Sequence, residues 1–277
     1  MVCNFGRCAE VTHASRMKTK KNASQRTRVK KTVRRRARVA RPKTPTSPVG
    51  LAPAGFPVIA MAASVGGLKA LSVILGGLPA DFPAAIAIVM HLSPDHKSIL
   101  AEILSRRTPL VVKQAHTGDV LCLGGVFIAP PNHHLAVAPG GRLKLSSPTA
   151  EKIHHARPSA EPLFASVAEV YQQDATAVVL TGGDGDGSFG VQVIKDHGGK
   201  VIAQDRPTSL DFSMPESSIE TGDVDFILPL DQIAAKLMEL VAARPGPAPR
   251  RPVRPRTKTR ALAKRAPRTR LLGLKRP

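Results

Sequence analysis

The sequence predicts an α/β protein with a doubly wound, mostly parallel sheet flanked by helices. Between residues 51 and 243, short apolar runs of strand length alternate with segments of helical character. This alternation is typical of parallel strands that are covered by helices on both faces. The chain has 277 residues with no Trp and one Tyr, so aliphatic side chains must supply the core. A domain of about 190 residues is long enough to bury one.

The apolar runs and the glycines between them place the elements in order. The run from Phe56 to Ala63 predicts a strand that ends just before Gly66-Gly67, where a helix can begin. The Gly-rich turn at 182–187 predicts the same change from strand to helix later in the chain. The expected strands cover 56–63, 84–90, 175–180, 200–203 and 225–228, and the expected helices cover 68–75, 97–106, 161–171, 188–196 and 230–241.

Residues 119–145 have a different pattern from the rest of this region. Their apolar residues come in short pieces, which are broken by Gly124-Gly125 and Gly140-Gly141. Closely spaced short strands with glycine turns are typical of hairpins. We therefore expect antiparallel hairpins here, inserted in the parallel sheet or lying at its edge.

Basic residues are concentrated at the two ends of the chain. Residues 1–50 carry 15 Lys and Arg against one acid, and residues 244–277 carry 13 against none, whereas residues 51–243 carry 13 against 19 acids. Neither end has the apolar periodicity that a packed core requires. We expect a disordered basic tail at 1–50, a folded domain at 51–243 and a disordered, Pro-rich basic tail at 244–277. Such tails either attract nucleic acid or anionic lipid or only keep the protein in solution.

The sequence also indicates the compartment. We expect no secretory signal peptide, because the N-terminus has no apolar stretch, and no membrane span, because no run of about 20 apolar residues exists. The three cysteines, Cys3, Cys8 and Cys122, are too few and too scattered for a disulfide framework. The sequence therefore predicts a cytoplasmic protein.

Three polar segments stand at predicted strand ends, and they contain Ser64, His91 and Asp186. The carboxyl ends of parallel strands line the binding crevice of an open sheet, so these side chains could meet there. Nucleophilic acyl transfer needs this set, because an imidazole removes the serine proton and a carboxylate orients the imidazole. The helix that begins near Leu68 would also offer backbone N–H groups to an oxyanion.

Each of these residues also has an ordinary structural interpretation. Ser64 before two glycines could cap a helix or cradle a phosphate, and His91 could be a hydrogen-bonded interior histidine. Asp186 could shape a turn or bind a cation weakly. The pair His154-His155 has no Cys or carboxylate at ligand spacing, so we expect no metal site, and no pattern calls for a cofactor.

Seven segments, in this order, resemble the catalytic domain of the chemotaxis protein-glutamate methylesterases (CheB-type), and the resemblance runs from about Val58 to Leu240. The segments are Ala-Ala-Ser-Val-Gly-Gly at 62–67, Val-Met-His-Leu-Ser at 89–93, Ile-Ala-Pro-Pro-Asn-His-His-Leu at 128–135, Arg-Pro-Ser-Ala-Glu-Pro-Leu-Phe at 157–164, Leu-Thr-Gly-Gly-Asp-Gly-Asp-Gly at 180–187, Ile-Ala-Gln-Asp at 202–205 and Ser-Met-Pro at 213–215. The resemblance implies a doubly wound α/β domain with an inserted hairpin.

The resemblance also implies roles for individual residues. Ser64 would be the nucleophile, His91 the general base, and Asp186, rather than Asp184, the third member of the triad. Backbone N–H groups near Val65 and Gly183 would hold the oxyanion. Further residues that would line the cleft are Arg157, Ser159, Met214 and His134.

The sequence departs from the family's pattern in three residues near this site. Family members commonly carry Thr where this chain has Val65, and loss of a hydroxyl that holds an oxyanion costs on the order of 10²-fold in rate. The family's Leu-Thr-Gly-Met-Gly reads Leu-Thr-Gly-Gly-Asp here, so Gly183 lacks a side chain and Asp184 adds a negative charge. Many members also begin with a phosphoacceptor receiver domain. Residues 1–50 are too few and too basic to form one, so we expect a stand-alone form.

The sequence therefore predicts a serine hydrolase that removes methyl esters from glutamates of methyl-accepting chemotaxis-type receptors and by resemblance also deamidates receptor glutamine. Its expected partner is a methylated helical receptor, with nucleic acid or an anionic membrane surface as a further partner of the tails. The alternative is a catalytically weakened domain of the same fold, which the tails tether to a polyanion. A third interpretation makes nucleic-acid binding the main role.

Overall fold

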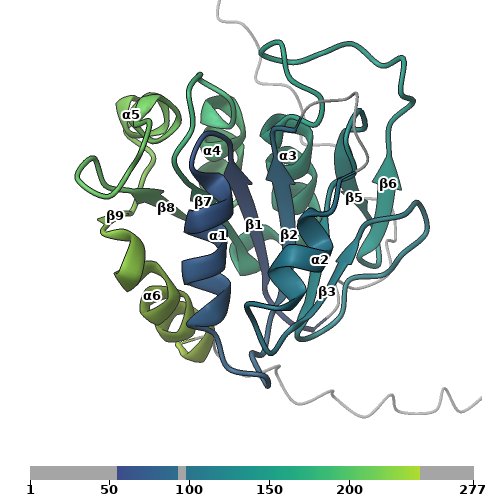
Figure 1. Ribbon diagram of the computed structural model, residues 1–277, viewed down its shortest axis with the longest axis horizontal. Helices are drawn as coiled ribbons and strands as arrows, with labels where there is room; N and C mark the ends of the chain where they lie inside the picture. The colour runs from purple at the N-terminus through teal and green to yellow at the C-terminus, as the bar shows by residue number, and fades with distance from the viewer. Residues whose placement is uncertain (1–54, 93–97, 244–277) are drawn as a thin grey trace, which may run out of the picture. The chain divides into compact units, whose positions relative to one another are not determined.

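The computed structural model describes residues 55–92 and 98–243. They contain a seven-stranded sheet, and helices cover both of its faces (Figure 1). Both predicted basic tails, 1–50 and 244–277, lie outside the described residues. In chain order the elements are β1 (Val58–Ala63), α1 (Gly67–Gly76), β2 (Ala85–Met90), α2 (Leu100–Ser105), β3 (Val111–Gln114), β4 (Gly125–Ile128), β5 (Leu135–Ala138), β6 (Arg142–Leu145), α3 (Ala160–Tyr171), the 3-10 helix η1 (Gln172–Asp174), β7 (Ala175–Val179), α4 (Ser188–Asp196), β8 (Lys200–Gln204), α5 (Ser213–Glu220), β9 (Phe226–Leu228) and α6 (Leu230–Ala242).

The strand order of the large sheet is β3-β4-β2-β1-β7-β8-β9, and every neighbouring pair in it is parallel. After β1 the chain adds strands on one side of it, and from β7 onward it adds strands on the other side. The order therefore reverses between β1 and β7, and such a reversal creates a crevice at the carboxyl edge of the sheet. A separate antiparallel pair, β5 and β6, completes the fold. The predicted fold class is confirmed.

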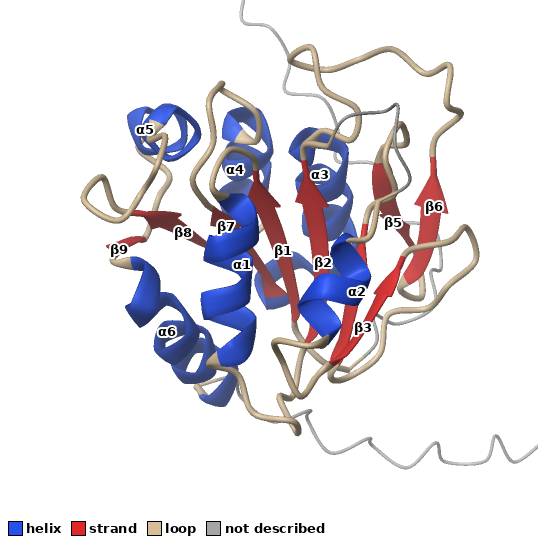
Figure 2. Cartoon of the chain, in the orientation of Figure 1, coloured by secondary structure: helices blue, strands red, loops and turns tan. Residues whose placement is uncertain are grey.

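The central strands are apolar on both faces, because both faces are covered (Figure 2). Along β1, Val58, Ala60 and Ala62 face a core cluster with α3, α4, α5 and the β5–β6 hairpin. The alternate residues, Ile59, Met61 and Ala63, face a second cluster with α1, α2 and α6. All six side chains are fully buried. These two layers hold the carboxyl ends of β1, β2 and β7 in fixed positions.

One local prediction was wrong in part, and two elements were not predicted. Within 119–145 the β5–β6 hairpin is antiparallel as expected, whereas Gly125–Ile128 forms β4 inside the parallel sheet. The edge strand β3 was not expected, since it is only four residues long and none of its residues is buried. Helix α5 was not expected either, because its sequence is polar and contains Pro215. Proline is tolerated there, since it lies in the first turn, where its missing N–H costs no helical hydrogen bond.

None of the helices within 55–92 and 98–243 is long and apolar enough to cross a membrane.

Close packing of α3 against α4 predicts that a larger side chain at position 190 destabilises the fold. A Cβ atom there would lie 2.6 Å from Cβ of Phe164. We therefore expect Gly190→Ala to lower the free energy of unfolding by about 1–3 kcal/mol, even though alanine is the better helix former. The measurement is the midpoint of urea unfolding. Gly55→Ala is the control, since nothing lies within 4 Å of its added methyl group. Equal midpoints for the two variants would contradict this packing.

Candidate active site

The three candidate residues come from the tips of three neighbouring strands. The register of β1 and β2 pairs Ala63 with Met90, and the next backbone bond runs from the N–H of His91 to the carbonyl of Ala63 at 3.1 Å. On the other side of β1, the N–H of Ser64 donates to the carbonyl of Thr181 at 3.0 Å. Ser64 therefore lies between the end of β2, which carries His91, and the loop after β7, which carries Asp186.

Asp186 is a fully buried carboxylate with three hydrogen-bond donors around it. His91 Nε2 lies 2.9 Å from Oδ2, the N–H of Ala160 donates to Oδ2 at 2.6 Å, and the Ser159 hydroxyl donates to Oδ1 at 2.5 Å. Ser159 and Ala160 form the N-terminus of α3, where the helix dipole favours a negative charge. The fold thus offsets the cost of burying this charge and directs one of its oxygens at the imidazole.

His91 is a mostly buried imidazole held against that carboxylate. Burial is the largest single influence and disfavours the charged ring, but the hydrogen bond and charge of Asp186, together with the charge of Asp184, outweigh it. The net effect raises the pKa of His91 above its ordinary value of 6.5. A stronger base that is fixed in orientation is what proton abstraction from a serine hydroxyl requires.

Ser64 lies on the strand tip beside that of His91. No hydrogen bond joins its hydroxyl to His91 among the residues that the structure describes. Two backbone N–H groups are available as donors: that of Val65, which follows Ser64, and that of Gly183 in the loop after β7. Neither has an acceptor within the described part of the chain. The side chain of Val65, which stands where family members commonly have threonine, is half exposed.

Thr181, Gly182 and Met214 hold the loop after β7 against Ser64. The Thr181 hydroxyl donates to the carbonyl of Val65 at 2.8 Å and accepts from the N–H of Asp211 at 3.0 Å. Gly182 has no room for a side chain, because a Cβ atom would lie 2.8 Å from Cβ of Ser64 and would also collide with the sulfur of Met214. Met214 is fully buried and its N–H donates to the carbonyl of Gly182 at 2.9 Å.

His134 and Arg157 brace the segment that leads into α3. The buried imidazole of His134 lies 2.8 Å from the carbonyl of Glu151 through Nε2 and accepts from the N–H of Ser159 through Nδ1 at 3.2 Å. Arg157 donates from Nε to Asn132 Oδ1 at 2.9 Å, and its other nitrogens donate to the same oxygen and to the carbonyl of Ala150. Both side chains therefore fix the position of Ser159, which in turn binds Asp186.

Ser159, His134 and Asp186 form a second grouping of serine, histidine and aspartate. Its bonding differs from that of a nucleophile and its base, since the Ser159 hydroxyl donates to Asp186 and only the backbone N–H of Ser159 contacts His134. Ser159 is also fully buried, so a substrate carbonyl cannot reach it. The grouping supports the carboxylate of Asp186.

Glu161 is a supporting residue that sequence reasoning missed. Its carboxylate accepts from the N–H groups of Gly187, Phe189 and Gly190 at the N-terminus of α4. Burial, opposed by these bonds and reinforced by the charge of Asp186, raises its pKa. The only sequence signal was an acid in the first turn of a helix. This bond network holds the loop that carries Asp186.

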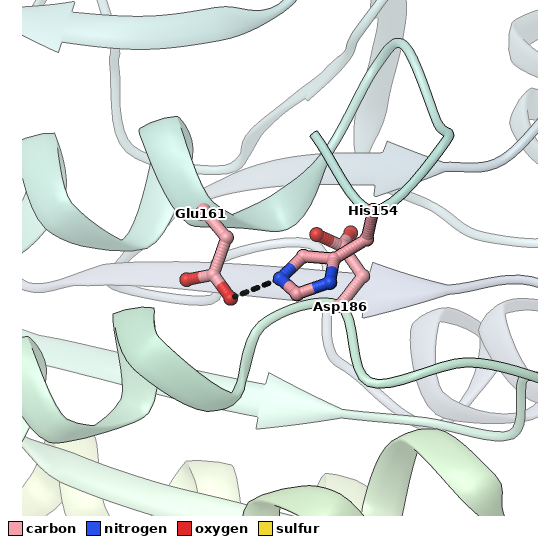
Figure 3. Close-up of side chains that lie close together, drawn as sticks. All are labelled: His154, Glu161 and Asp186. Atoms are coloured by element: carbon pink, nitrogen blue, oxygen red, sulfur yellow. Dashed lines mark ion pairs between the residues drawn. The ribbon is translucent and has the colours of Figure 1, made fainter. Parts of the chain in front are cut away.

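The argument from spacing against a carboxylate partner for His154 was wrong. In the structure His154 Nε2 lies 3.6 Å from Glu161 Oε1, and both lie near Asp186 (Figure 3). His154 and Glu161 are close in sequence and meet because the loop before α3 folds back over its N-terminus, whereas Asp186 comes from the loop after β7. Both carboxylates already accept hydrogen bonds through each of their oxygens, so the contact with the exposed His154 is an ion pair at the rim of a saturated network.

A parallel α/β sheet that gathers serine, histidine and buried aspartate at one edge has the architecture of a serine hydrolase. Comparison with known proteins gives the family. The CheB methylesterase family model matches residues 59–237. A protein-glutamate methylesterase/protein-glutamine glutaminase of Anaeromyxobacter dehalogenans is 42% identical over 183 residues, which cover 66% of this chain and 53% of that protein. One from a group 3 operon of Rhizobium meliloti is 37% identical over 212 residues, covering 76% and 57%.

The CheB methylesterase catalytic domain of Thermotoga maritima has a similar solved structure. It has a TM-score of 0.65 and 37% identity, and the match covers 68% of this chain and 100% of that one. The chain belongs to the CheB methylesterase family. It spans about half the length of the curated relatives it matches.

The environment of His91 predicts its titration. Its C–H resonance in NMR should titrate above pH 6.5, and Asp186→Asn should lower that pKa, because the substitution removes the stabilising charge. Stabilisation of the fold by the charged pair is complete below the pKa of the unfolded chain and is lost as pH rises through the raised folded value. His91→Gln identifies the resonance. A pKa at or below 6.5 in the unsubstituted protein would contradict the geometry.

Proposed function

We propose that this chain is a protein-glutamate methylesterase that hydrolyses glutamate methyl esters in chemoreceptor-type proteins, with Ser64, His91 and Asp186 as its catalytic residues. One observation carries the proposal. The imidazole of His91 is held 2.9 Å from a fully buried carboxylate, on the strand tip beside Ser64. Membership of the CheB methylesterase family supports the choice of substrate.

The proposed reaction begins with attack of Ser64 Oγ on the ester carbonyl carbon, while His91 takes the hydroxyl proton. The negative charge that develops on the carbonyl oxygen is bound by the backbone N–H groups of Val65 and Gly183, which are free in the described residues. Asp186 stabilises the imidazolium that forms. The ester bond then breaks, and methanol leaves with the proton from His91.

The second half of the reaction regenerates the enzyme. His91 removes a proton from water, the hydroxide attacks the glutamyl ester of Ser64, and Ser64 departs with that proton. Glutamine can follow the same course with ammonia in place of methanol, and the relatives' names include a protein-glutamine glutaminase activity. We propose that the same site also deamidates receptor glutamine.

An apolar groove beside Ser64 supports the proposal that the substrate is a helical protein. Its volume is about 610 Å³, and it runs between α1 and α2 from Ser64 past Leu68 and Val73 to Ile103. Two exposed cations, Lys69 and Arg107, border it and have no acidic partner among the described residues. An amphipathic helix with acidic residues beside its ester would fit such a surface through apolar anchors and charge complementarity.

The described residues do not test the remaining predictions from the sequence. A cytoplasmic location is compatible with the proposed receptor substrate and remains a prediction. The same holds for the domain limits at 50/51 and 243/244, and for a polyanion partner of residues 1–50 and 244–277, for which the only support is their charge.

Replacement of the proposed nucleophile tests the mechanism. Ser64→Ala should abolish methanol release from a methylated receptor fragment and prevent labelling by a fluorophosphonate, since both need the hydroxyl. His91→Gln should slow labelling by at least about 10²-fold, because the base is lost. Ser105→Ala is the matched control, since this exposed serine donates only to the carbonyl of Glu102 and does not line the groove. Unchanged methanol release in Ser64→Ala would end the proposal, and a chain that is never labelled would favour a binding module.

The groove predicts a separation between small and large substrates. Val73→Asp places a charge in the apolar groove, so we expect KM for a methylated receptor fragment to rise by about 10-fold or more. Fluorophosphonate labelling at Ser64 should stay within about twofold, since Val73 is remote from the reacting atoms. Val111→Asp is the control, because Val111 is 72% exposed on the edge strand β3. Equal effects of the two variants on KM would exclude the groove.

A further inference from the structure

Two carboxylates, rather than one, face the imidazole of His91. Asp186 Oδ2 lies 2.9 Å from Nε2, and Asp184 Oδ2 lies 3.5 Å from Nδ1 on the opposite side of the ring. The imidazole side chain is 14% exposed and that of Asp184 is 30% exposed, so solvent screens this second contact only in part. Each ring nitrogen therefore has its own acidic neighbour.

The position of Asp184 is fixed by the loop itself. Its Oδ1 accepts the backbone N–H of Asp186 at 3.0 Å, which closes a short turn between the two acids. The bond leaves Oδ2 directed at His91. Because the same turn carries both acids, the loop that places Asp186 beside Nε2 also places Asp184 beside Nδ1.

We propose that Asp184 is a positioning residue that clamps His91 from the side opposite to Asp186 and competes with the Ser64 hydroxyl for Nδ1. The proposal rests on the proposed function, in which His91 is the base. With Nε2 directed at Asp186, Nδ1 is the nitrogen that remains to take the serine proton. In the structure Nδ1 faces Asp184, and no hydrogen bond joins it to Ser64.

The clamp acts differently on the two protonation states of the ring. A protonated imidazole donates from both nitrogens and can satisfy both carboxylates, but it cannot act as a base. A neutral imidazole with its proton on Nε2 presents a lone pair at Nδ1, which the Asp184 carboxylate repels. Asp184 thus favours the inactive, protonated ring at low pH, and rising pH releases Nδ1 for Ser64.

Other charged groups near His91 come from the segment before α3. Lys152, His154, His155 and Arg157 line the same polar pocket as His91 and Asp184, which has a volume of about 330 Å³. Arg157 is engaged by Asn132 and the carbonyl of Ala150, and His154 pairs with Glu161. Among the described residues only Asp184 and Asp186 form ion pairs with His91.

The test is the pH profile of fluorophosphonate labelling at Ser64 in Asp184→Asn. Asparagine keeps the side-chain oxygen that accepts the N–H of Asp186 but removes the charge at Nδ1. We expect the acid limb of the profile to move to lower pH, so that below the midpoint the variant is labelled about 3- to 10-fold faster than the unsubstituted chain. The His91 resonance in NMR should move in the same direction.

Asp205→Asn is the matched control. It removes one negative charge from another loop at the carboxyl edge of the sheet, and its carboxylate binds Thr208 rather than His91. Its profile should coincide with that of the unsubstituted chain, so a shift there would show a general charge effect and overturn the specific one. Asp184→Ser is a second variant, because a serine hydroxyl can also close the turn.

The outcomes separate this inference from the proposed function. A shifted His91 titration in Asp184→Asn without any labelling of Ser64 would support the clamp and refute the nucleophile. Normal labelling with an unmoved acid limb and an unmoved His91 resonance would support the nucleophile and overturn the clamp. If Asp184→Asn fails to fold, the same two readouts on Asp184→Ser decide the question.

Discussion

The burial of the Asp186 carboxylate is the constraint on which the arrangement of the site depends. A charge with no exposure to water is tolerated only when its oxygens are hydrogen-bonded, and here the N-terminus of α3 and the ring of His91 supply the donors. To hold those donors in place, His134 and Arg157 fix the segment before α3, and Glu161 binds the N-terminus of α4. The orientation of one imidazole thus involves three segments that are distant in the sequence.

The parallel sheet determines which residues can take part. β1 lies between β2 and β7, and the strand order reverses beside it, so the loops after these three strands open onto one edge. Ser64, His91 and Asp186 each lie on one of those loops. The glycines between them allow close approach, since a side chain at Gly182 would push against Ser64. The register of the strands, rather than any single contact, therefore brings these three residues to one edge of the sheet.

The acidic loop after β7 distinguishes this chain within that framework. Gly183 leaves space that the side chain of Asp211 approaches, because a Cβ atom at Gly183 would lie 2.5 Å from its carboxylate. Asp184 faces the imidazole of His91 with one carboxylate oxygen, and its other oxygen accepts the N–H of Asp186. The negative charge that the sequence adds at this loop therefore has a titratable ring as its neighbour, which is the basis of the positioning role proposed for it.

The sequence by itself determined the fold class, because continuous apolar runs and the glycine breaks after them are local signals of buried parallel strands. It also placed Ser64, His91 and Asp186 at strand ends. It could not place β3 or α5, whose short or polar sequences acquire structure only from their neighbours. Only the tertiary structure decided the partners of Glu161, His134 and Asp184, since those contacts join segments separated by many residues and depend on distances that composition and spacing do not encode.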